Sequence, residues 1–316
     1  MNGFNRKIDS LRISVTDRCN LRCAYCMPPE GVEPVLQQEV LTFEEITRLV
    51  NIFSSLGIKK IRLTGGEPLV RKDIVSLIKS LAGIKGIEEV CLTTNGIMLS
   101  EYAPELKKAG AKRINISLDT LKEEKFKDIT GSNCFYEVIK GIEQASNSGF
   151  SPLKINTVVM RGINEDEVID FLNFSLSKGL VLRFIEFMRV TPLWREDYFI
   201  PIEEIKEICL SRFTLEKTQY FGSGPAEYYK TAAGIIGFIK TDLNNCRQCN
   251  RLRLTSTGEL KLCLYETGGL SLNSFLRNGA SDKEIQDIIA ESLGLKVNVD
   301  YRNWEYGKVY MSVLGG

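Results

Sequence analysis

The chain has 316 residues, of which 43% are hydrophobic and 26% charged, and its formal net charge is +1. This balance is typical of a globular protein with one large domain or two ordinary ones, and it does not indicate binding to nucleic acid or to a membrane surface. The sequence contains no histidine, which excludes Ser-His-Asp and Cys-His catalysis, histidine-ligated zinc and histidine general bases. Cysteine, carboxylate, lysine, arginine and backbone groups must therefore carry any chemistry.

No apolar run approaches the roughly 18 residues that a membrane span needs, and the start MNGFNRKIDS lacks the apolar stretch of a secretory signal. We therefore expect a cytoplasmic protein with no membrane partner. Thiols stay mostly reduced in that compartment, so the nine cysteines are expected to be metal ligands or buried thiols rather than disulfides.

Short β-branched runs alternate with helix-like segments up to about residue 190. The predicted strands are 11–16, 59–65, 88–96, 113–119, 153–160 and 181–188. Capping pairs predict helix starts between the strands: Thr42 with Glu45, Thr120 with Glu123, and Asn164 with Glu167. Six βα units imply a parallel sheet, open or curled into part of a barrel, whose active face lies at the carboxyl ends of the strands.

Polar side chains recur on one face of three predicted strands. They are Arg12, Ser14 and Thr16; Lys60, Arg62 and Thr64; and Asn115, Ser117 and Asp119. A buried parallel strand is expected to be apolar on both faces. The recurring polar face favours the wall of a partial barrel that holds a ligand, with solvated edge strands as the alternative.

The strand-helix alternation ends after residue 190. A helix is predicted over 201–210, a hairpin with strands 251–256 and 259–265, and a helix over 282–294 that ends at Gly294. We interpret residues 1–200 as the partial barrel and residues 201–316 as a smaller C-terminal region packed on its open side.

Three cysteines follow the first predicted strand, in the spacing Cys19-x3-Cys23-x2-Cys26. A redox pair would use only Cys23 and Cys26, and structural zinc takes four Cys or His ligands. An iron–sulfur cluster with four irons would be left with one iron open to a cofactor or substrate. The third interpretation is favoured, because it accounts for all three thiols.

The stretch CNLRCAYC, residues 19–26, together with TGGEP, residues 64–68, resembles the radical S-adenosylmethionine superfamily. The glycines allow the backbone to approach a ligand closely, and Glu67 is expected to meet an ammonium group. The resemblance implies a [4Fe-4S] cluster on the three cysteines, with S-adenosylmethionine chelated at the open iron. It also implies cleavage of that cofactor to a 5′-deoxyadenosyl radical, which abstracts hydrogen from the substrate.

A second group, Cys246-x2-Cys249-x13-Cys263, again supplies three ligands. Taken alone, it is equally compatible with a zinc ribbon that lacks one ligand. Beside a radical cluster loop, a second iron–sulfur cluster with an open iron is favoured.

This combination resembles the GTP 3′,8-cyclase family over nearly the whole chain. The matching stretches are LRISVTDRCNLRCAYCM, KKIRLTGGEPLVRKD, TTNG, NISLDTL, KINTVVMRG, RFIEFM, GPAEYY, CNRLRLT and the terminal GG. The resemblance implies an α/β fold, an incomplete (β/α)6 TIM-like barrel, with a second [4Fe-4S] cluster in a C-terminal α+β region. It also implies a lyase that converts GTP to (8S)-3′,8-cyclo-7,8-dihydroguanosine 5′-triphosphate, the first step of molybdenum cofactor biosynthesis.

The sequence has no GxxxxGK[ST] loop, so a triphosphate would need side-chain cations, and the guanidinium groups of Arg251 and Arg253 suit phosphate oxygens. Lys60 and Arg183 lie on predicted strands as further cations. The family motifs imply GTP contacts at Arg12, Arg62, Thr93, Lys154, Arg251 and Arg253. They imply S-adenosylmethionine contacts at Tyr25, Gly66, Ser117 and Met188, although Arg183 and Met188 differ in strand parity.

The resemblance also implies that the tail glycines, Gly315 and Gly316, enter the active site and are catalytic. Its implied partners are a low-potential electron donor such as flavodoxin or ferredoxin and a downstream cyclic pyranopterin monophosphate synthase, and it allows a homodimer. The chain departs from the family at Asn245, at Arg189 and in TSTGEL, none of which removes a ligand. The rival functions are a radical enzyme that modifies peptides and a zinc-ribbon module that binds RNA.

Overall fold

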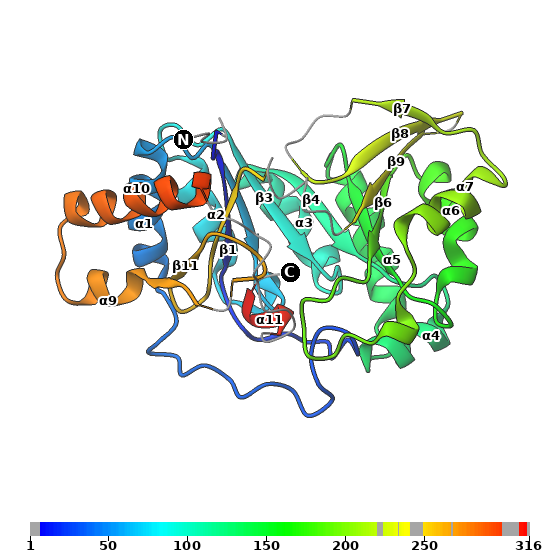
Figure 1. Cartoon of the computed structure of the whole chain (residues 1–316), viewed down its shortest axis with the longest axis horizontal. Coiled ribbons are helices and arrows are strands. Elements are labelled where there is room, and N and C mark those ends of the chain that lie inside the picture. The colour runs from blue at the N-terminus through cyan, green and yellow to red at the C-terminus, as the bar shows by residue number, and fades with distance from the viewer. Residues whose placement is uncertain are drawn as a thin grey trace.

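The computed structural model of the chain describes residues 7–219, 224–232, 234–240, 249–266, 268–298 and 310–314. In these ranges one sheet has the strand order β12-β11-β10-β1-β2-β3-β4-β5-β6-β9-β8-β7 (Figure 1). The strands are β1 (Ser10–Ser14), β2 (Lys60–Thr64), β3 (Glu89–Thr94), β4 (Ala111–Ser117), β5 (Lys154–Val159), β6 (Val181–Glu186), β7 (Glu216–Thr218), β8 (Glu227–Thr231), β9 (Gly234–Ile239), β10 (Arg251–Leu254), β11 (Glu259–Lys261) and β12 (Leu270–Ser271).

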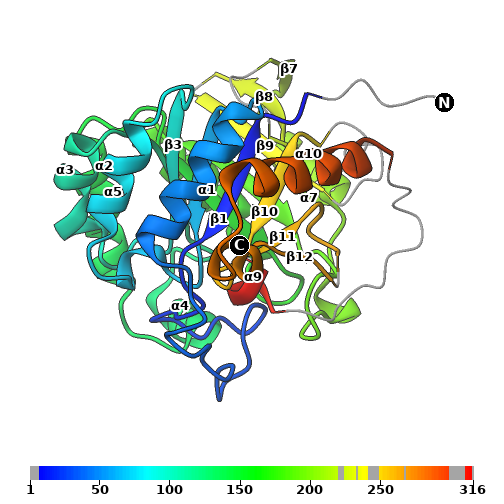
Figure 2. The same cartoon turned by 90° about the vertical axis from the view of Figure 1, so that its left-hand side faces the viewer.

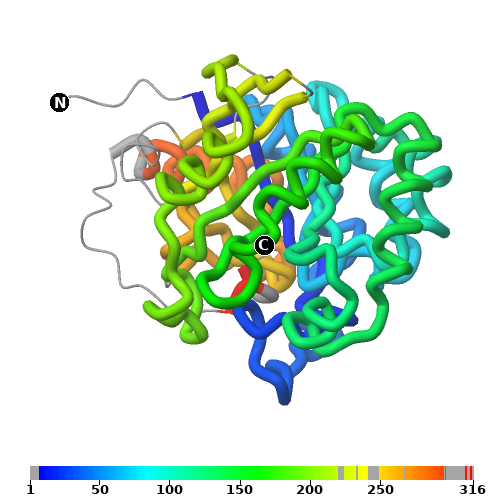
Figure 3. The backbone as a smooth tube through the Cα atoms, turned by 90° about the vertical axis from the view of Figure 1, so that its right-hand side faces the viewer, coloured from blue at the N-terminus to red at the C-terminus, as the bar shows by residue number. Residues whose placement is uncertain are grey.

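Helices follow most of the parallel strands and cover the outer face of the curved sheet (Figures 1 and 3). The α-helices are α1 (Phe43–Ser55), α2 (Ile74–Ala82), α3 (Leu99–Lys108), α4 (Glu123–Thr130), α5 (Phe135–Asn147), α6 (Val168–Ser177), α7 (Ile202–Leu210), α9 (Leu272–Arg277), α10 (Asp282–Asn298) and α11 (Met311–Leu314). Short 3-10 helices are η1 (Pro68–Val70), η2 (Glu165–Glu167) and η3 (Glu196–Tyr198). None of the helices in these ranges has the length and apolar character that crossing a membrane requires.

The six βα units predicted from the sequence are confirmed, because β1 to β6 lie side by side in chain order and run parallel. Strand β10 adds to the β1 edge and β9 to the β6 edge, both also parallel. The chain after residue 201 therefore continues the sheet at both edges of the six-unit core. Helix α10 packs beside α1 on the outside (Figure 2), where Arg48 pairs with Asp282 at 2.7 Å.

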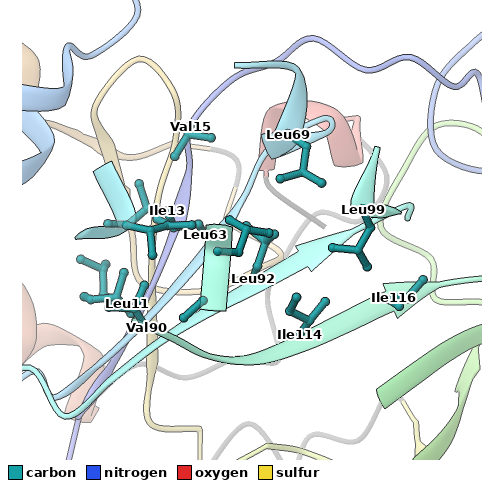
Figure 4. Close-up of a cluster of buried hydrophobic side chains, with 14 of the residues drawn as sticks. Leu11, Ile13, Val15, Leu63, Leu69, Val90, Leu92, Leu99, Ile114 and Ile116 are labelled. Atoms are coloured by element: carbon teal, nitrogen blue, oxygen red, sulfur yellow. The ribbon is translucent and has the colours of Figure 1, made fainter. Parts of the chain in front are cut away.

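The two faces of the strands separate apolar from polar side chains. Leu11, Ile13, Leu63, Leu92 and Ile114 are buried between the sheet and its helices (Figure 4). Burial of each such side chain stabilises the fold by about 1.5–3 kcal/mol. The residues between them point to the inner face, which is therefore available for a ligand.

Helix α1 begins as predicted, because Thr42 accepts from the Glu45 backbone N–H and Glu45 accepts from that of Thr42. The capping prediction for Thr120 is wrong, since Lys122 is the N-cap residue of α4. Asn164 does lie at the N-cap position of η2, which leads into α6, but its side chain makes no capping hydrogen bond. The Thr120 hydroxyl donates to the buried Glu167 carboxylate at 2.8 Å, and the Asn164 amide donates to the Asp119 carbonyl at 2.6 Å. These side chains join the loops after β4 and β5 instead of capping helices.

Several predicted strands extend one or two residues beyond the observed ones. The helix predicted over 282–294 does not end at Gly294. Helix α10 continues to Asn298. Its last turn carries Lys296, which is fully buried. This burial accounts for a helix that continues through a residue of low helix propensity.

Candidate active site

A cavity of about 430 Å³ lies on the inner face of the sheet. With the exception of Glu67, the described residues that the sequence predicted as cluster ligands, cofactor contacts or substrate contacts all line it. These are Cys19, Cys23, Cys26, Cys249, Cys263, Tyr25, Gly66, Ser117, Met188, Arg12, Arg62, Thr93, Lys154, Arg251 and Arg253. The predicted ligand Cys246 and the tail residues Gly315 and Gly316 lie outside the described residues.

The two cysteine groups lie at opposite edges of the parallel strands. Cys19 follows the carboxyl end of β1, whereas Cys249 precedes β10, which is parallel to β1 with Ser10 beside Arg251. Strand β11 runs antiparallel to β10, so Cys263, which follows β11, returns to the edge where Cys249 lies. One cavity therefore connects both groups of thiols.

The loop that carries the first three cysteines is tied to neighbouring elements. Backbone N–H groups of Arg22 and Ala24 donate to carbonyls of Thr130 and Ile129, at the end of α4. The N–H groups of Cys26 and Met27 both donate to the Cys23 carbonyl, which forms a tight turn. The thiols are thus presented on a fixed backbone.

Gly66 holds the second motif against this loop. Its N–H donates to the Thr16 carbonyl at 2.8 Å, and the Glu67 N–H donates to the Arg18 carbonyl at 2.8 Å. A Cβ at position 66 would lie 2.2 Å from the Arg18 carbonyl oxygen, so no other residue fits. Gly66 lines the cavity, and it is also required because its backbone lies directly against the backbone of residues 16–18.

The expectation that Glu67 meets an ammonium group is wrong. Its side chain is 1% exposed and does not line the cavity. The carboxylate accepts from the Thr94 hydroxyl and the Asn95 N–H, both at 2.7 Å, and from the Leu69 N–H at 3.0 Å. Burial raises the pKa of Glu67 to about 7, against the lowering effect of these hydrogen bonds. Glu67 therefore joins η1 to the end of β3.

Asp119 fixes the aromatic residue of the cluster loop. The Tyr25 hydroxyl donates to one Asp119 oxygen at 2.6 Å, and the Val158 N–H donates to the other at 2.8 Å. Burial raises the pKa of Asp119 to about 6, and both hydrogen bonds oppose that rise. Thr191 donates to the Tyr25 carbonyl at 3.1 Å. The polar face of β4 predicted that Asp119 faces a ligand cavity, but not that it holds Tyr25.

Cationic side chains cross the cavity at one level of the sheet. Strand register places Arg253 beside Arg12, Arg12 beside Arg62, Arg62 beside Cys91, and Cys91 beside Arg113. Residues in register on neighbouring strands point to the same face. This arginine rung, residues Arg253, Arg12, Arg62, Cys91 and Arg113, therefore faces the cavity from five strands.

Burial and repulsion by neighbouring cations act together on Arg12 and on Lys154, whereas Arg113 forms an ion pair with the Glu89 carboxylate. Burial lowers the pKa of Arg12 well below its usual value, and the charges of Arg253 and Arg62 lower it further. Burial, followed by the charge of Arg183, lowers the pKa of Lys154 to about 7. An anion in the cavity would favour the charged forms of Arg12 and Lys154.

Several buried polar atoms on the cavity wall have no hydrogen-bond partner among the described residues. They are Thr93 Oγ1, Asn156 Oδ1, and Nε and one terminal nitrogen of Arg183. Buried polar atoms are normally paired, so these atoms point to a bound polar ligand. Met188 lies two residues past the end of β6, which explains how it and Arg183 both reach the cavity despite their parity.

A lysine that sequence reasoning missed lies beside the second cysteine group. Lys296 donates to the Leu262 carbonyl, and its Nζ is 3.9 Å from Cys249 Sγ. Burial raises the pKa of the Cys249 thiol, but the charges of Arg251 and Lys296 outweigh burial and bring the pKa to about 7. Nothing in the local sequence marks Lys296, because only the packing of α10 brings it to the hairpin.

The donor chemistry at both ends fits iron–sulfur ligation, since cysteine thiols line the cavity at each end and thiolates are the ligands that such clusters take. No three Cys, Asp or Glu side chains in the described ranges are grouped around a single ion position. A cuboidal cluster does not require such a group, because each cysteine ligates a different iron.

Family models cover most of the chain. The Radical SAM superfamily model matches residues 13–175, and the Molybdenum Cofactor Synthesis C model matches residues 180–300. The chain is 47% identical over 300 residues to the GTP 3′,8-cyclase of Thermodesulfovibrio yellowstonii, covering 93% of each chain. It is 42% identical over 322 residues to that of Pelotomaculum thermopropionicum, covering 99% of each chain.

Among solved structures, SuiB of Streptococcus suis bound to S-adenosylmethionine is similar with a TM-score of 0.64. The similarity covers 90% of this chain and 65% of that chain, at 16% identity. At this identity the comparison concerns the fold alone.

Replacing Gly66 by alanine should displace the cluster loop, because the new methyl group would overlap the Arg18 carbonyl. We expect Gly66→Ala to retain about half of the iron that the parent chain binds on anaerobic reconstitution. The matched control is Gly83→Ala, whose Cβ would lie 3.5 Å from its nearest neighbour. Equal iron in Gly66→Ala and Gly83→Ala would contradict the steric argument.

Removing the Lys296 charge should raise the pKa of Cys249 above about 7. In metal-free protein at pH 7, we expect Lys296→Met to slow alkylation of Cys249 by about three- to tenfold, because less thiolate is present. Tryptic residues 248–251 contain no other cysteine, so mass spectrometry can follow this site alone. Lys283→Met is the control, since Lys283 is exposed on the same helix; an unchanged rate in Lys296→Met would refute the assignment.

Proposed function

The chain belongs to the radical S-adenosylmethionine superfamily and, within it, to the GTP 3′,8-cyclase family, and from this membership we propose how its cavity acts on GTP. The enzyme is a lyase that joins ribose C3′ of GTP to guanine C8, in the first step of molybdenum cofactor biosynthesis. The observation that carries the proposal is one cationic cavity that connects two groups of thiols.

Residues at the carboxyl edge of the strands hold the cofactor. Cys19, Cys23 and Cys26 ligate a [4Fe-4S] cluster, and Tyr25, Gly66, Ser117 and Met188 contact S-adenosylmethionine. When bound there and reduced, this pair supplies a 5′-deoxyadenosyl radical for hydrogen abstraction. The chain's part is to fix the cluster loop through Gly66 and Asp119, and to keep the reacting groups out of bulk water.

Residues at mid-cavity and at the opposite edge hold GTP. Cationic side chains bind the phosphates, because guanidinium and ammonium donors suit phosphate oxygens. These side chains are Arg12, Arg62, Lys154, Arg251 and Arg253. The Thr93 hydroxyl, which has no hydrogen-bond partner in the part of the chain that the structure describes, provides a further polar contact. Cys249 and Cys263, with Cys246, would hold a second [4Fe-4S] cluster, which would supply a binding position for the guanine base. The ribose then lies between the two edges of the sheet.

The remaining assignments are part of the same proposal. Gly315 and Gly316 enter the cavity and take part in catalysis, consistent with Met311 lining it. The proposal also places the domain boundary at residue 200 and the protein in the cytoplasm as a homodimer. Its electron donor is a flavodoxin or ferredoxin, and its product passes to a cyclic pyranopterin monophosphate synthase. The near-neutral net charge gives no support to a nucleic-acid partner.

A radical enzyme that modifies peptides is the rival from the same superfamily, since SuiB has also been solved with its precursor peptide. Arg12 and Arg253 favour a small polyanion over a peptide, because a negative ligand would offset both their burial and their mutual repulsion. A zinc-ribbon module does not account for a cavity that spans both cysteine groups.

The assignment can be tested in one anaerobic experiment. After reconstitution with iron and sulfide and reduction, the chain should convert S-adenosylmethionine to 5′-deoxyadenosine with GTP and release the cyclised nucleotide. ATP serves as the matched control and should give no cyclised product. Absence of 5′-deoxyadenosine, or GTP recovered unchanged, would show that the assignment is wrong.

The phosphate assignment has its own test. Arg251→Ala and Arg253→Ala should each weaken GTP use by about ten- to a hundredfold in kcat/KM, since each loses a charge-assisted contact. Iron content should remain that of the parent chain. Loss of iron in either variant would instead make the arginine structural.

A further inference from the structure

Tyr228 reaches the cavity from a strand that is not next to the barrel core. Strand register places Arg183 on β6 beside Gly237 on β9, and Gly237 beside Tyr228 on β8. Tyr228 is 6% exposed and lines the cavity. Its ring must therefore cross over β9 to meet side chains of β5 and β6.

Gly237 leaves the space that this crossing needs. A Cβ at position 237 would lie 2.9 Å from Cε1 of Tyr228 and 3.0 Å from Cγ of Arg183. Real Cβ atoms almost never approach other atoms so closely, so any other residue would displace the ring or the arginine stem. An aromatic ring lying across a strand glycine also restores packing that the glycine lacks.

The Tyr228 hydroxyl is a common acceptor for two cations. Lys154 Nζ donates to it at 3.1 Å and lies 5.1 Å from the ring centroid. Arg183 also makes a side-chain hydrogen bond with Tyr228, whereas its Nε and one terminal nitrogen have no partner in the described ranges. A neutral oxygen thus draws Lys154 and Arg183 together without supplying a negative charge, and unpartnered Arg183 donors remain.

We propose that Tyr228, placed by the gap at Gly237, is a positioning residue that holds Lys154 and Arg183 together as one binding site for phosphate groups of the substrate. The identity of that substrate as GTP rests on the proposed function, whereas the phosphate site does not. Inorganic tripolyphosphate therefore tests the site independently of any turnover.

The variants are Tyr228→Phe, which removes only the hydroxyl, and Gly237→Ala, which displaces the ring. Tyr229→Phe is the matched control, since Tyr229 lies on the same strand and its hydroxyl is 3.4 Å from Glu227. Gly234→Ala controls for the glycine change, because its Cβ would meet the flexible end of Leu176. All four are compared with the parent chain at equal iron content.

At pH 7.5 we expect Tyr228→Phe and Gly237→Ala to bind tripolyphosphate and GTP about tenfold more weakly, the loss expected for one charge-assisted hydrogen bond. Guanosine binding should be unchanged. KM for GTP should rise, whereas kcat should stay within about twofold of the parent value. The two control variants should match the parent chain. A structural defect would instead weaken guanosine binding as much as tripolyphosphate binding.

The pH profile gives a second readout. Around Lys154 lie Arg183, Arg113, Arg62, Cys91 and Tyr228, from β6, β4, β2, β3 and β8. With a Lys154 pKa of about 7, anion binding that uses its charge is strong below pH 7 and weakens above it. Loss of the Tyr228 acceptor disfavours the charged form, so the decline in binding should begin at lower pH in Tyr228→Phe, measured relative to Tyr229→Phe.

The inference would be overturned if Tyr228→Phe bound tripolyphosphate as tightly as the parent chain does. It would also be overturned if the variant lost as much affinity for guanosine as for tripolyphosphate. A parent chain that does not bind tripolyphosphate would overturn it as well. A parent chain that binds tripolyphosphate through Tyr228 but leaves GTP uncyclised would overturn the proposed function while the phosphate site stands. If Tyr228→Phe lost its fold, Gly237→Ala against Gly234→Ala would still decide the outcome.

Discussion

The burial of several cations around one cavity is the constraint on which the rest of this structure depends. Arg12, Arg253 and Lys154 face one cavity from three strands of the sheet, and burial lowers the pKa of each. The fall in the Lys154 pKa from 10.5 to about 7 corresponds to roughly 5 kcal/mol against its charged form. The apolar core on the outer face holds the strands together despite this unfavourable free energy. The fold therefore maintains a site that a polyanion would stabilise.

Parallel register determines how the site is shared between the two ends of the sheet. The first three cysteines follow the carboxyl end of β1, and the hairpin of β10 and β11 returns Cys249 and Cys263 to the opposite edge. A ligand long enough to span the strands can thus contact both thiol groups and the cations between them. A nucleoside triphosphate carries the negative charge that these cations would compensate.

Side chains that look like local devices in the sequence are often used for tertiary contacts. Thr42 and Glu45 form the capping box that their spacing predicts, because both partners lie in one helical turn. Thr120 and Asn164 have equally suitable neighbours, yet they bond Glu167 and the Asp119 carbonyl across the loops after β4 and β5. Glu67 is likewise drawn to Thr94 and Asn95 at the end of the neighbouring strand. In each case the side chain also hydrogen-bonds a group that is distant in sequence, which its local pattern does not predict.

The sequence by itself determined the alternation of strands and helices, the polar inner face of β1, β2 and β4, and the spacing of the first thiol group. These features have periods of two to four residues, so short-range geometry is sufficient to predict them. Only the tertiary structure decided that Arg253 and Arg113 share a level, that Lys296 lies beside Cys249, and that Tyr228 crosses Gly237 to Lys154. Such pairs depend on strand register and on helix packing between segments far apart in the chain, which no local pattern specifies.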